Sequence, residues 1–483
     1  MERIGKSVGW IAAIGISLSY LGVLWKFATN SFFADDFWTE KYSSAVVHGH
    51  LTPTLLWEQW NESRMVVSHI FIAASTILDH YNTRHLIFVS GFLMVGAYLL
   101  VLKLESKWSR RPVGLASALC IGIPWFSLAA IFTALWAFQL EWYLVVFFFV
   151  VMVWALDEDR LSPSTGMAIG IAAAVLTTLS SVQGILCWVV GAALVIWKSP
   201  ISRQAWRRLS AWGIACAATL GIYFLGYSFS DQIALCPPGR SCTLGASLAN
   251  PLGVVKFWLN LTGLGFSGGG TRGQLVGVLV TIGALALLIQ TVRQRTTRPR
   301  SPLPAALCAF ALLWDGAITV GRVNYGNHQY IADWYALPQS ILYASLAIAA
   351  LGELRNKRSE SPHRRATMTV PAALLLLLVL VAPLVSVPHN LKVAQSLTES
   401  QDRVARFSVN IAEQPKRFRI CDEAVIFQAG FGNRTSAIFY EAIIAALRRD
   451  HLVMFAPGSF ETNRKKGLPT LPPCGYFPNA SFK

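Results

Sequence analysis

The sequence has little charge for its length. Asp, Glu, Lys and Arg make up 14% of its 483 residues, whereas 54% are hydrophobic. A soluble globular protein carries about 25% charged residues, so the composition excludes an ordinary soluble domain. Apolar runs long enough to cross a bilayer core of about 30 Å recur along the chain. The sequence therefore predicts an all-α, multi-pass membrane protein, and its net charge of +16 indicates membrane topology rather than nucleic-acid binding.

Several motifs are also missing. The sequence contains no Walker phosphate-binding loop, no dinucleotide-binding glycine fingerprint and no soluble cytoplasmic domain able to bind a nucleotide sugar. No cysteine pair has the neighbouring ligands of a zinc site. Group-transfer chemistry on the outer face of the membrane would therefore need a donor that is already there, which in a cell envelope is a lipid-linked one.

Eleven apolar segments are predicted to span the membrane, with ends placed to within about four residues. The first has basic residues before it and no small-residue cleavage site after it, so we interpret it as a retained signal anchor. The predicted spans are residues 7–27, 85–102, 113–126, 140–156, 165–179, 185–197, 209–228, 274–291, 302–320, 334–351 and 367–387.

Four connections between spans are rich in Lys and Arg and are expected on the cytoplasmic side. They lie at residues 103–111, 198–208, 293–300 and 355–365. All four fall on that side if the N-terminus is inside and the apolar run 65–78 does not span the membrane. Because this run has a polar stripe at helical spacing, we expect a helix lying along the membrane surface. A short, tilted span is the alternative.

This topology divides the chain into two parts. Residues 1–387 form the transmembrane domain, with a first outer loop at 30–84 and further outer loops at 231–273 and 321–333. Residues 388–483 form a small, mixed extracytoplasmic C-terminal domain.

Four cysteines fall in the predicted outer segments, where an oxidising compartment favours disulfides. Cys236 and Cys242 close the short turn "CPPGRSC" and are predicted to pair. Cys421 and Cys474 are a second pair, assigned by elimination.

The stretch "SFFADDFWTE" places two acids, Asp35 and Asp36, among three phenylalanines and Trp38 directly after the first span. A carboxylate beside aromatic rings and a membrane face tends to a raised pKa, which suits a base that accepts a proton from a sugar hydroxyl. Neighbouring residues of an extended loop point in opposite directions. We therefore expect one acid to face a reaction and the other to fix the loop, the alternative being a solvated loop in which Asp36 caps a short helix.

Further polar residues gather on the same predicted side of the membrane. Arginines there are candidates for binding a phosphate by paired hydrogen bonds. The alternatives are snorkelling of Arg322 to head groups, a flexible glycine loop around Arg272, a local Glu62–Arg64 ion pair and a satisfied interfacial His328. The candidates for phosphate binding are Arg322, Arg272, Arg64 and His328, and those for substrate binding or loop support are Asn61, Glu62, Trp38, Glu141, Gln183 and Tyr330.

A first span followed by a large outer loop with "DD" near its start resembles the GT-C class of membrane glycosyltransferases. The stretches "DDFW" and "NESR" are similar to the "DDW" and "NEHR" of a group of bacterial polytopic proteins, although Ser63 replaces the histidine of the second motif. "ALWAFQLEW", "LSSVQGILCW" and "GRVNYGNHQYIADWYALP" look like later landmarks of that group.

The resemblance implies a GT-C-like fold and inverting transfer of a sugar from a polyprenyl phosphate to an envelope glycan, such as lipopolysaccharide O antigen. The site would face the periplasm or cell exterior from the cytoplasmic (inner) membrane. Asp35 or Asp36 would be the base, and Arg322, with Arg272 or Arg64, would stabilise the leaving phosphate. A divalent metal, Mg or Mn, between Asp36 and Glu62 is left open.

Two other functions are kept as alternatives. One is a transporter or flippase of lipid-linked sugars, which would need acids and arginines along a path through the membrane. The other is an envelope acyltransferase or polymerase that uses His and Arg of the outer loops.

Overall fold

The computed structural model describes residues 2–198, 202–228, 241–266, 270–294, 301–324, 333–355, 362–412 and 436–467. Nine of the helices in these ranges are long and apolar enough to cross a membrane. The protein is an all-α, multi-pass membrane protein, as the composition predicts. The bundle is built from α1 (Glu2–Phe27), α5 (Thr83–Ser109), α6 (Leu115–Trp125), α7 (Ile131–Ala134), α8 (Leu140–Asp157), α9 (Pro163–Ser180), α10 (Cys187–Lys198), α11 (Arg203–Tyr223), α14 (Pro251–Thr262), α15 (Gly270–Gln294), α16 (Leu303–Arg322), α17 (Leu337–Arg355) and α18 (Pro362–Ala412).

The nine candidate spans match nine of the eleven predicted ones, so the number eleven stays a prediction. Predicted span 185–197 lies in the shorter apolar helix Val182–Lys198. Predicted span 209–228 corresponds to α11, which is not among the nine and carries arginines in its first two turns.

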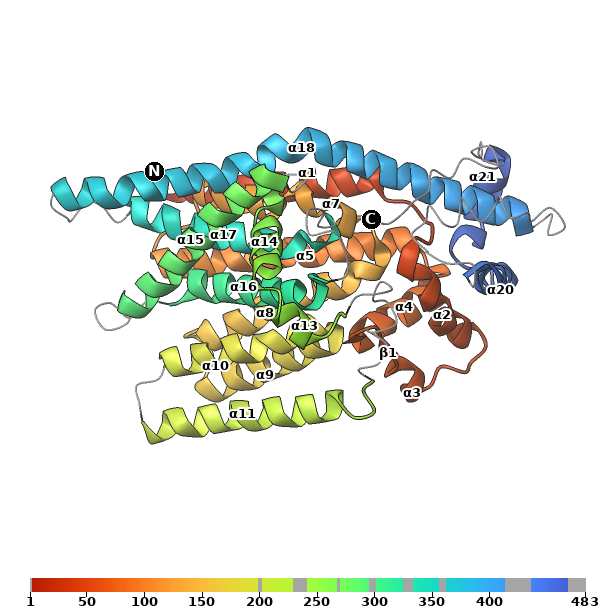
Figure 1. The fold of residues 1–483 in the computed structure, drawn as a ribbon, viewed down its shortest axis with the longest axis horizontal. Helices are drawn as coiled ribbons and strands as arrows, with labels where there is room; N and C mark the ends of the chain where they lie inside the picture. The colour runs from red at the N-terminus through yellow and green to blue at the C-terminus, as the bar shows by residue number, and fades with distance from the viewer. Residues whose placement is uncertain are drawn as a thin grey trace.

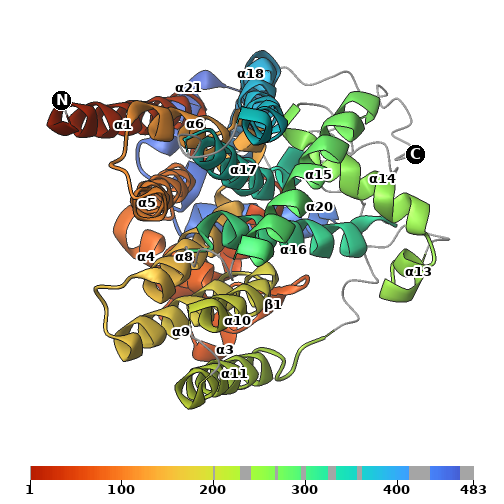
Figure 2. The ribbon, with the colours of Figure 1, turned by 90° about the vertical axis from the view of Figure 1, so that its left-hand side faces the viewer.

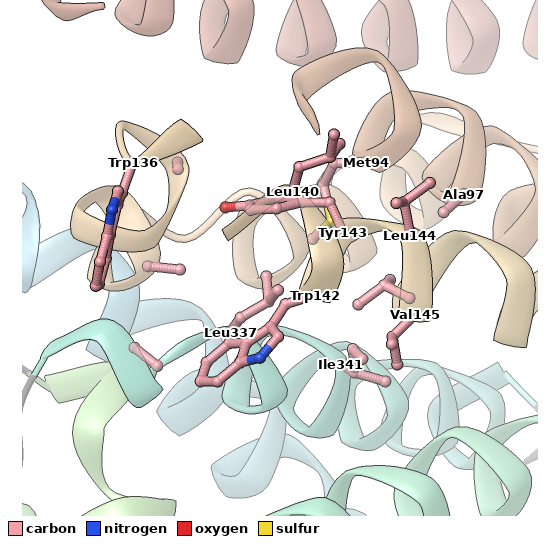
Figure 3. Packing of buried hydrophobic residues seen from close by; sticks show 14 of the residues in the cluster. Met94, Ala97, Trp136, Leu140, Trp142, Tyr143, Leu144, Val145, Leu337 and Ile341 are labelled. Carbon is pink, nitrogen blue, oxygen red and sulfur yellow. The ribbon is translucent and has the colours of Figure 1, made fainter. Parts of the chain in front are cut away.

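The helix α8 forms the centre of the bundle. Its residues are apolar on all sides, a pattern typical of a fully buried helix. Figure 3 shows Met94 and Ala97 of α5 on one side of α8 and Leu337 and Ile341 of α17 on the other. The residues of α8 between them are Leu140, Trp142, Tyr143, Leu144 and Val145. In Figure 2, α17 lies among α15, α16 and α18, while α11 lies at the edge of the bundle.

Short elements gather at one end of the bundle, which we call the loop end (right in Figure 1). After α1 come η1 (Ala34–Thr39), α2 (Glu40–Val47), α3 (Pro53–Leu56), the hairpin strands β1 (Gln59–Trp60) and β2 (Ser63–Arg64), and α4 (Val66–Asp79). With 14 residues, α4 is about 21 Å long, which is short for a bilayer core of about 30 Å. Its placement along the membrane surface stays a prediction.

The C-terminal elements α20 (Ser436–Arg449), η9 (Val453–Phe455) and α21 (Ser459–Lys466) also lie at the loop end (Figure 1). Asp450 accepts a hydrogen bond from Ser44 Oγ of α2 at 2.9 Å and lies 3.1 Å from His48 Nε2. The backbone N–H of Val453 donates to the carbonyl of His80 at 3.0 Å. The first loop is therefore held against the C-terminal segment.

The helix α18 is 51 residues long, roughly 75 Å, and runs along the whole bundle (Figure 1). The domain boundary predicted between residues 387 and 388 falls inside this continuous helix. No break in secondary structure marks that boundary, so the division into two domains stays a prediction.

The basic connections meet at the end of the bundle opposite the loop end. Lys107 and Lys198 both pair with Asp159, at 2.9 and 3.0 Å. Arg111 donates to the carbonyl of Arg355 at 3.3 Å, and Gln290 near the end of α15 donates to Glu353 of α17 at 2.8 Å. The described residues of the four basic segments thus share one end, the arrangement that their assignment to one side of the membrane requires.

Candidate active site

The two neighbouring acids of the first loop have different surroundings. Asp36 is fully buried, and its Oδ2 accepts a hydrogen bond from the backbone N–H of Phe33 at 2.9 Å. Thr39 Oγ1 donates to the Asp36 carbonyl and contacts the hydroxyl of Tyr81. Burial raises the pKa of Asp36 well above its ordinary value. Asp36 therefore holds the turn through both its side chain and its backbone carbonyl.

Asp35 is partly exposed in the same turn. Burial raises its pKa to about 7; the negative charge of Glu62 adds to the rise, and the positive charge of Arg322 opposes it. A carboxyl group with a pKa near the working pH can exchange a proton in a reaction. Asp35 is thus the acid of the pair that is both reachable and able to act as a base.

An ion pair joins Glu62 to Arg322, two residues far apart in the sequence. Glu62 lies at the tip of the β1–β2 hairpin next to Asn61, whose φ of +47° is left-handed, a conformation that asparagine tolerates better than most residues. Arg322 occupies the last turn of α16, where the helix dipole favours a cation. The fold therefore brings a loop acid and a bundle arginine together beside Asp35.

Aromatic side chains form a wall near the acids. The rings of Trp38 and Trp60 lie 4.5 Å apart, and Trp60 lies 6.5 Å from Phe138. Trp136 lies 5.9 Å from Phe138, and its Nε1 donates to the carbonyl of Phe33 at 3.0 Å. Trp136 and Phe138 are buried, whereas Trp38 and Trp60 are partly exposed, so the wall keeps an apolar surface beside the turn.

Glu141 and Gln183 line the inner side of this region. Glu141, in the first turn of α8, is buried and close enough to repel Glu62 and Asp35. Gln183 Oε1 accepts a hydrogen bond from Ser181 Oγ. Ser181 Oγ lies 3.2 Å from Ser63 Oγ, so Ser63, which stands where the similar bacterial motif has histidine, links the hairpin to the end of α9.

The other two predicted arginines are Arg64 of the hairpin strand β2 and Arg272 of α15. Arg64 is 4% exposed and donates to the carbonyls of Tyr223, Leu225 and Trp57, which favours a role in holding the hairpin over phosphate binding. Arg272 is exposed in the first turn of α15.

Five of the predicted residues lie outside the described part of the chain, namely His328, Tyr330, Cys236, Cys421 and Cys474. Cys242 is disulfide-bonded. The predicted disulfide pairs therefore stay predictions.

A metal site finds no support in the part of the chain that the structure describes. No group of three His, Cys, Asp or Glu side chains comes together there in a way that could hold a metal ion. The carboxyl group of Asp36 is directed to the Phe33 N–H rather than toward Glu62.

Sequence reasoning missed two residues at the loop end of α11. The hydroxyl groups of Tyr223 and Tyr227 both donate to the carbonyl of Glu62, at 3.4 and 3.0 Å. The available signal was a pair of tyrosines four residues apart at the end of a predicted span. In the structure α11 ends at Tyr223, and Tyr227 follows the turn after the helix.

The fold and the site define a multi-pass α-helical membrane protein with a half-buried acid, an ion pair and an aromatic wall at one end of its bundle. No family model and no curated protein matches the chain.

Two solved structures are similar to it. The crystal structure of ArnT from Cupriavidus metallidurans in the apo state is 14% identical, with 84% of this chain and 81% of that chain covered and a TM-score of 0.44. The crystal structure of ArnT from the same organism bound to undecaprenyl phosphate is 13% identical, with 85% and 81% covered and a TM-score of 0.47.

Proposed function

We propose that the protein is a glycosyltransferase that moves a sugar from a polyprenyl phosphate to a hydroxyl group of a cell-envelope glycan, such as lipopolysaccharide O antigen. The reaction takes place at the outer face of the cytoplasmic membrane. The observation that carries this proposal is Asp35, a reachable carboxyl group with a pKa of about 7 next to the Glu62–Arg322 ion pair. The motif resemblance of the first loop to GT-C enzymes agrees with it.

In the proposed reaction, Asp35 takes the proton of the acceptor hydroxyl. The acceptor oxygen forms a bond to the anomeric carbon while the bond from that carbon to the phosphate oxygen breaks. Polyprenyl phosphate leaves, and the anomeric configuration inverts because the displacement is direct. A positioned base of this kind contributes a rate factor of roughly 10²–10⁴.

Arg322 is the proposed phosphate ligand. A guanidinium group binds carboxylates and phosphates through the same paired N–H groups, so a donor phosphate can replace Glu62 as its partner. The negative charge that develops on the leaving phosphate is then stabilised by a cation already in place. Trp38 and Trp60 supply the apolar face for a sugar ring.

A transporter of lipid-linked sugars is the second candidate, and one observation favours it. Asp315 is fully buried within α16, two helical turns before Arg322, and accepts a hydrogen bond from Gln339 Nε2 at 2.8 Å. An ionisable residue inside a membrane protein often marks a transport path.

One experiment separates the two candidates. The purified protein is incubated with a labelled polyprenyl-phosphate sugar and an envelope-glycan acceptor, and product glycan is separated from lipid. A glycosyltransferase gives labelled glycan, and Asp35→Asn removes it while donor binding is kept. The matched control, Asp159→Asn at the opposite end of the bundle, leaves transfer unchanged. Movement of the intact lipid-linked sugar across a vesicle membrane without labelled glycan would instead show a transporter.

A further inference from the structure

The hairpin that carries Glu62 is hydrogen-bonded to the last residue of α11 and to the short segment that follows it. Ser228 N donates to Gln59 Oε1 at 2.9 Å, and Gln59 Nε2 donates back to the Ser228 carbonyl at 2.8 Å. Arg64 N donates to Tyr223 Oη at 3.0 Å, and Arg64 Nε to the Tyr223 carbonyl at 2.8 Å. The hairpin is therefore bound to a helix that follows it by more than 150 residues.

Most of α11 makes no such contribution. Of its residues only Trp212 and Tyr223 are buried, and Trp212 Nε1 donates to the carbonyl of Trp188 in α10 at 2.9 Å. Figure 1 shows α11 at the edge of the bundle. The polar contacts with the hairpin come from Tyr223, the last residue of α11, and from residues 225–228 after it. Their concentration in this short stretch indicates a local purpose beyond membrane anchoring.

The contacts of Tyr223 and Tyr227 converge on the tip of the hairpin. Both hydroxyl groups donate to the backbone carbonyl of Glu62. On the other side, Ser63 Oγ accepts from the backbone N–H of Val182 at 3.3 Å. With its backbone fixed from two sides, Glu62 directs its carboxylate to Arg322.

We propose that Tyr223 and Tyr227 are positioning residues that hold the Glu62 carboxylate between Asp35 and Arg322. This inference rests on the proposed function, since it concerns the same site. Neither tyrosine touches the reacting atoms; both act through the hairpin backbone.

The charges around Asp35 give this role a measurable signature. The groups that act on Asp35 are Glu62 and Arg322, with Asp36 and Glu141 also close enough to repel it. When Glu62 moves away, Asp35 loses a repulsive neighbour and Arg322 loses its countercharge. Both changes favour the ionised carboxylate, so the pKa of Asp35 falls below about 7.

The test compares the double variant Tyr223→Phe/Tyr227→Phe with Glu62→Gln. Transfer rates are measured across pH at several donor concentrations. We expect Glu62→Gln to lower the pH of half-maximal rate by about one unit, and the double variant to lower it in the same direction by less, with a changed donor KM. The control Tyr98→Phe also removes a buried hydroxyl bonded to a carbonyl, that of Ala118 at 2.6 Å, and shifts neither quantity.

A second readout does not depend on catalysis. Hydrogen exchange of the backbone amides of residues 59–64 should speed up in the double variant and stay as in the wild type in Tyr98→Phe. Unchanged hairpin exchange together with an unchanged pH profile overturns the positioning role. Failure of the proposed function would be seen differently. Wild-type protein without transfer activity, or Asp35→Asn with full activity, would refute the reaction. Hairpin exchange would still decide whether the two tyrosines hold the loop.

Discussion

Replacing Asp35 by asparagine keeps the size and polarity of the side chain and removes its ability to accept a proton. Loss of a general base lowers a rate by roughly 10²–10⁴, which corresponds to about 3–5 kcal/mol of activation free energy. Because Arg322 and the aromatic wall are unchanged, we expect donor binding to stay within a few-fold of wild type. The assay measures initial transfer rates and donor binding on the same preparations.

The pH dependence of the transfer rate gives a second quantitative prediction. With a pKa of about 7, Asp35 is about half ionised at pH 7 and about one tenth ionised at pH 6. The transfer rate should therefore fall roughly fivefold between these values and about tenfold for each further unit. Residual activity of Asp35→Asn should lack this limb of the profile.

Asp36 provides the matched comparison. The fully buried Asp36 accepts the Phe33 N–H through one side-chain oxygen, and an asparagine side chain of the same shape also supplies such an oxygen, so Asp36→Asn should keep most activity. Asp36→Ala instead leaves the buried Phe33 N–H without its acceptor, a loss of about 1–3 kcal/mol in stability. Activity lost in Asp36→Asn but kept in Asp35→Asn would exchange the two roles. Full activity in both would refute the catalytic reasoning.

Three further predictions concern the cation, the topology and the cysteines. Arg322→Ala should weaken donor binding and transfer together by about 10- to 100-fold, whereas Arg272→Ala at an exposed position should change either by less; equal effects would argue against Arg322 as the phosphate ligand. Lys107→Cys should resist a membrane-impermeant thiol reagent added outside cells, and labelling there would overturn the topology. Cys236 and Cys242 should be recovered as one disulfide-linked peptide under non-reducing conditions, with a stabilisation of about 2 kcal/mol; free thiols at both positions would contradict this.

Local pattern in the sequence was enough to find the apolar spans and the acidic turn. The span pattern succeeds because the bilayer imposes helix length and apolar composition directly. The two acids of the turn could be singled out because carboxylates rarely occur directly beside a membrane span and aromatic rings. Which of them is buried depends on the Phe33 N–H and on Thr39, contacts that only the folded turn creates.

Contacts between distant segments could not be predicted in the same way. The sequence offered Arg64 as a neighbour for Glu62, but the hairpin directs Arg64 to carbonyl groups at the end of α11 and Glu62 to Arg322. The contacts of Tyr223 and Tyr227 were equally hard to predict, because both residues belong to a segment that the sequence predicts only as a membrane span. Long-range partners of this kind follow from tertiary packing rather than from spacing.

The acids of the site also have a cost in stability, which offers a last prediction. The folded protein raises the pKa of Asp35 from 3.8 to about 7, so the folded state binds this proton more tightly than the unfolded state. By linkage, the contribution of Asp35 to the free energy of unfolding falls as pH rises from about 4 to about 7 and stays reduced above that. Asparagine does not ionise, so Asp35→Asn should unfold at a temperature equal to or above that of the wild type at pH 8, while the difference should disappear only below about pH 4. A site kept for structure alone would not retain an acid that its own surroundings make unfavourable, since a neutral side chain of the same size fits as well. If thermal unfolding at pH 8 showed Asp35→Asn to be clearly less stable than the wild type, Asp35 would be a structural residue, and the argument for a base at this position would fail.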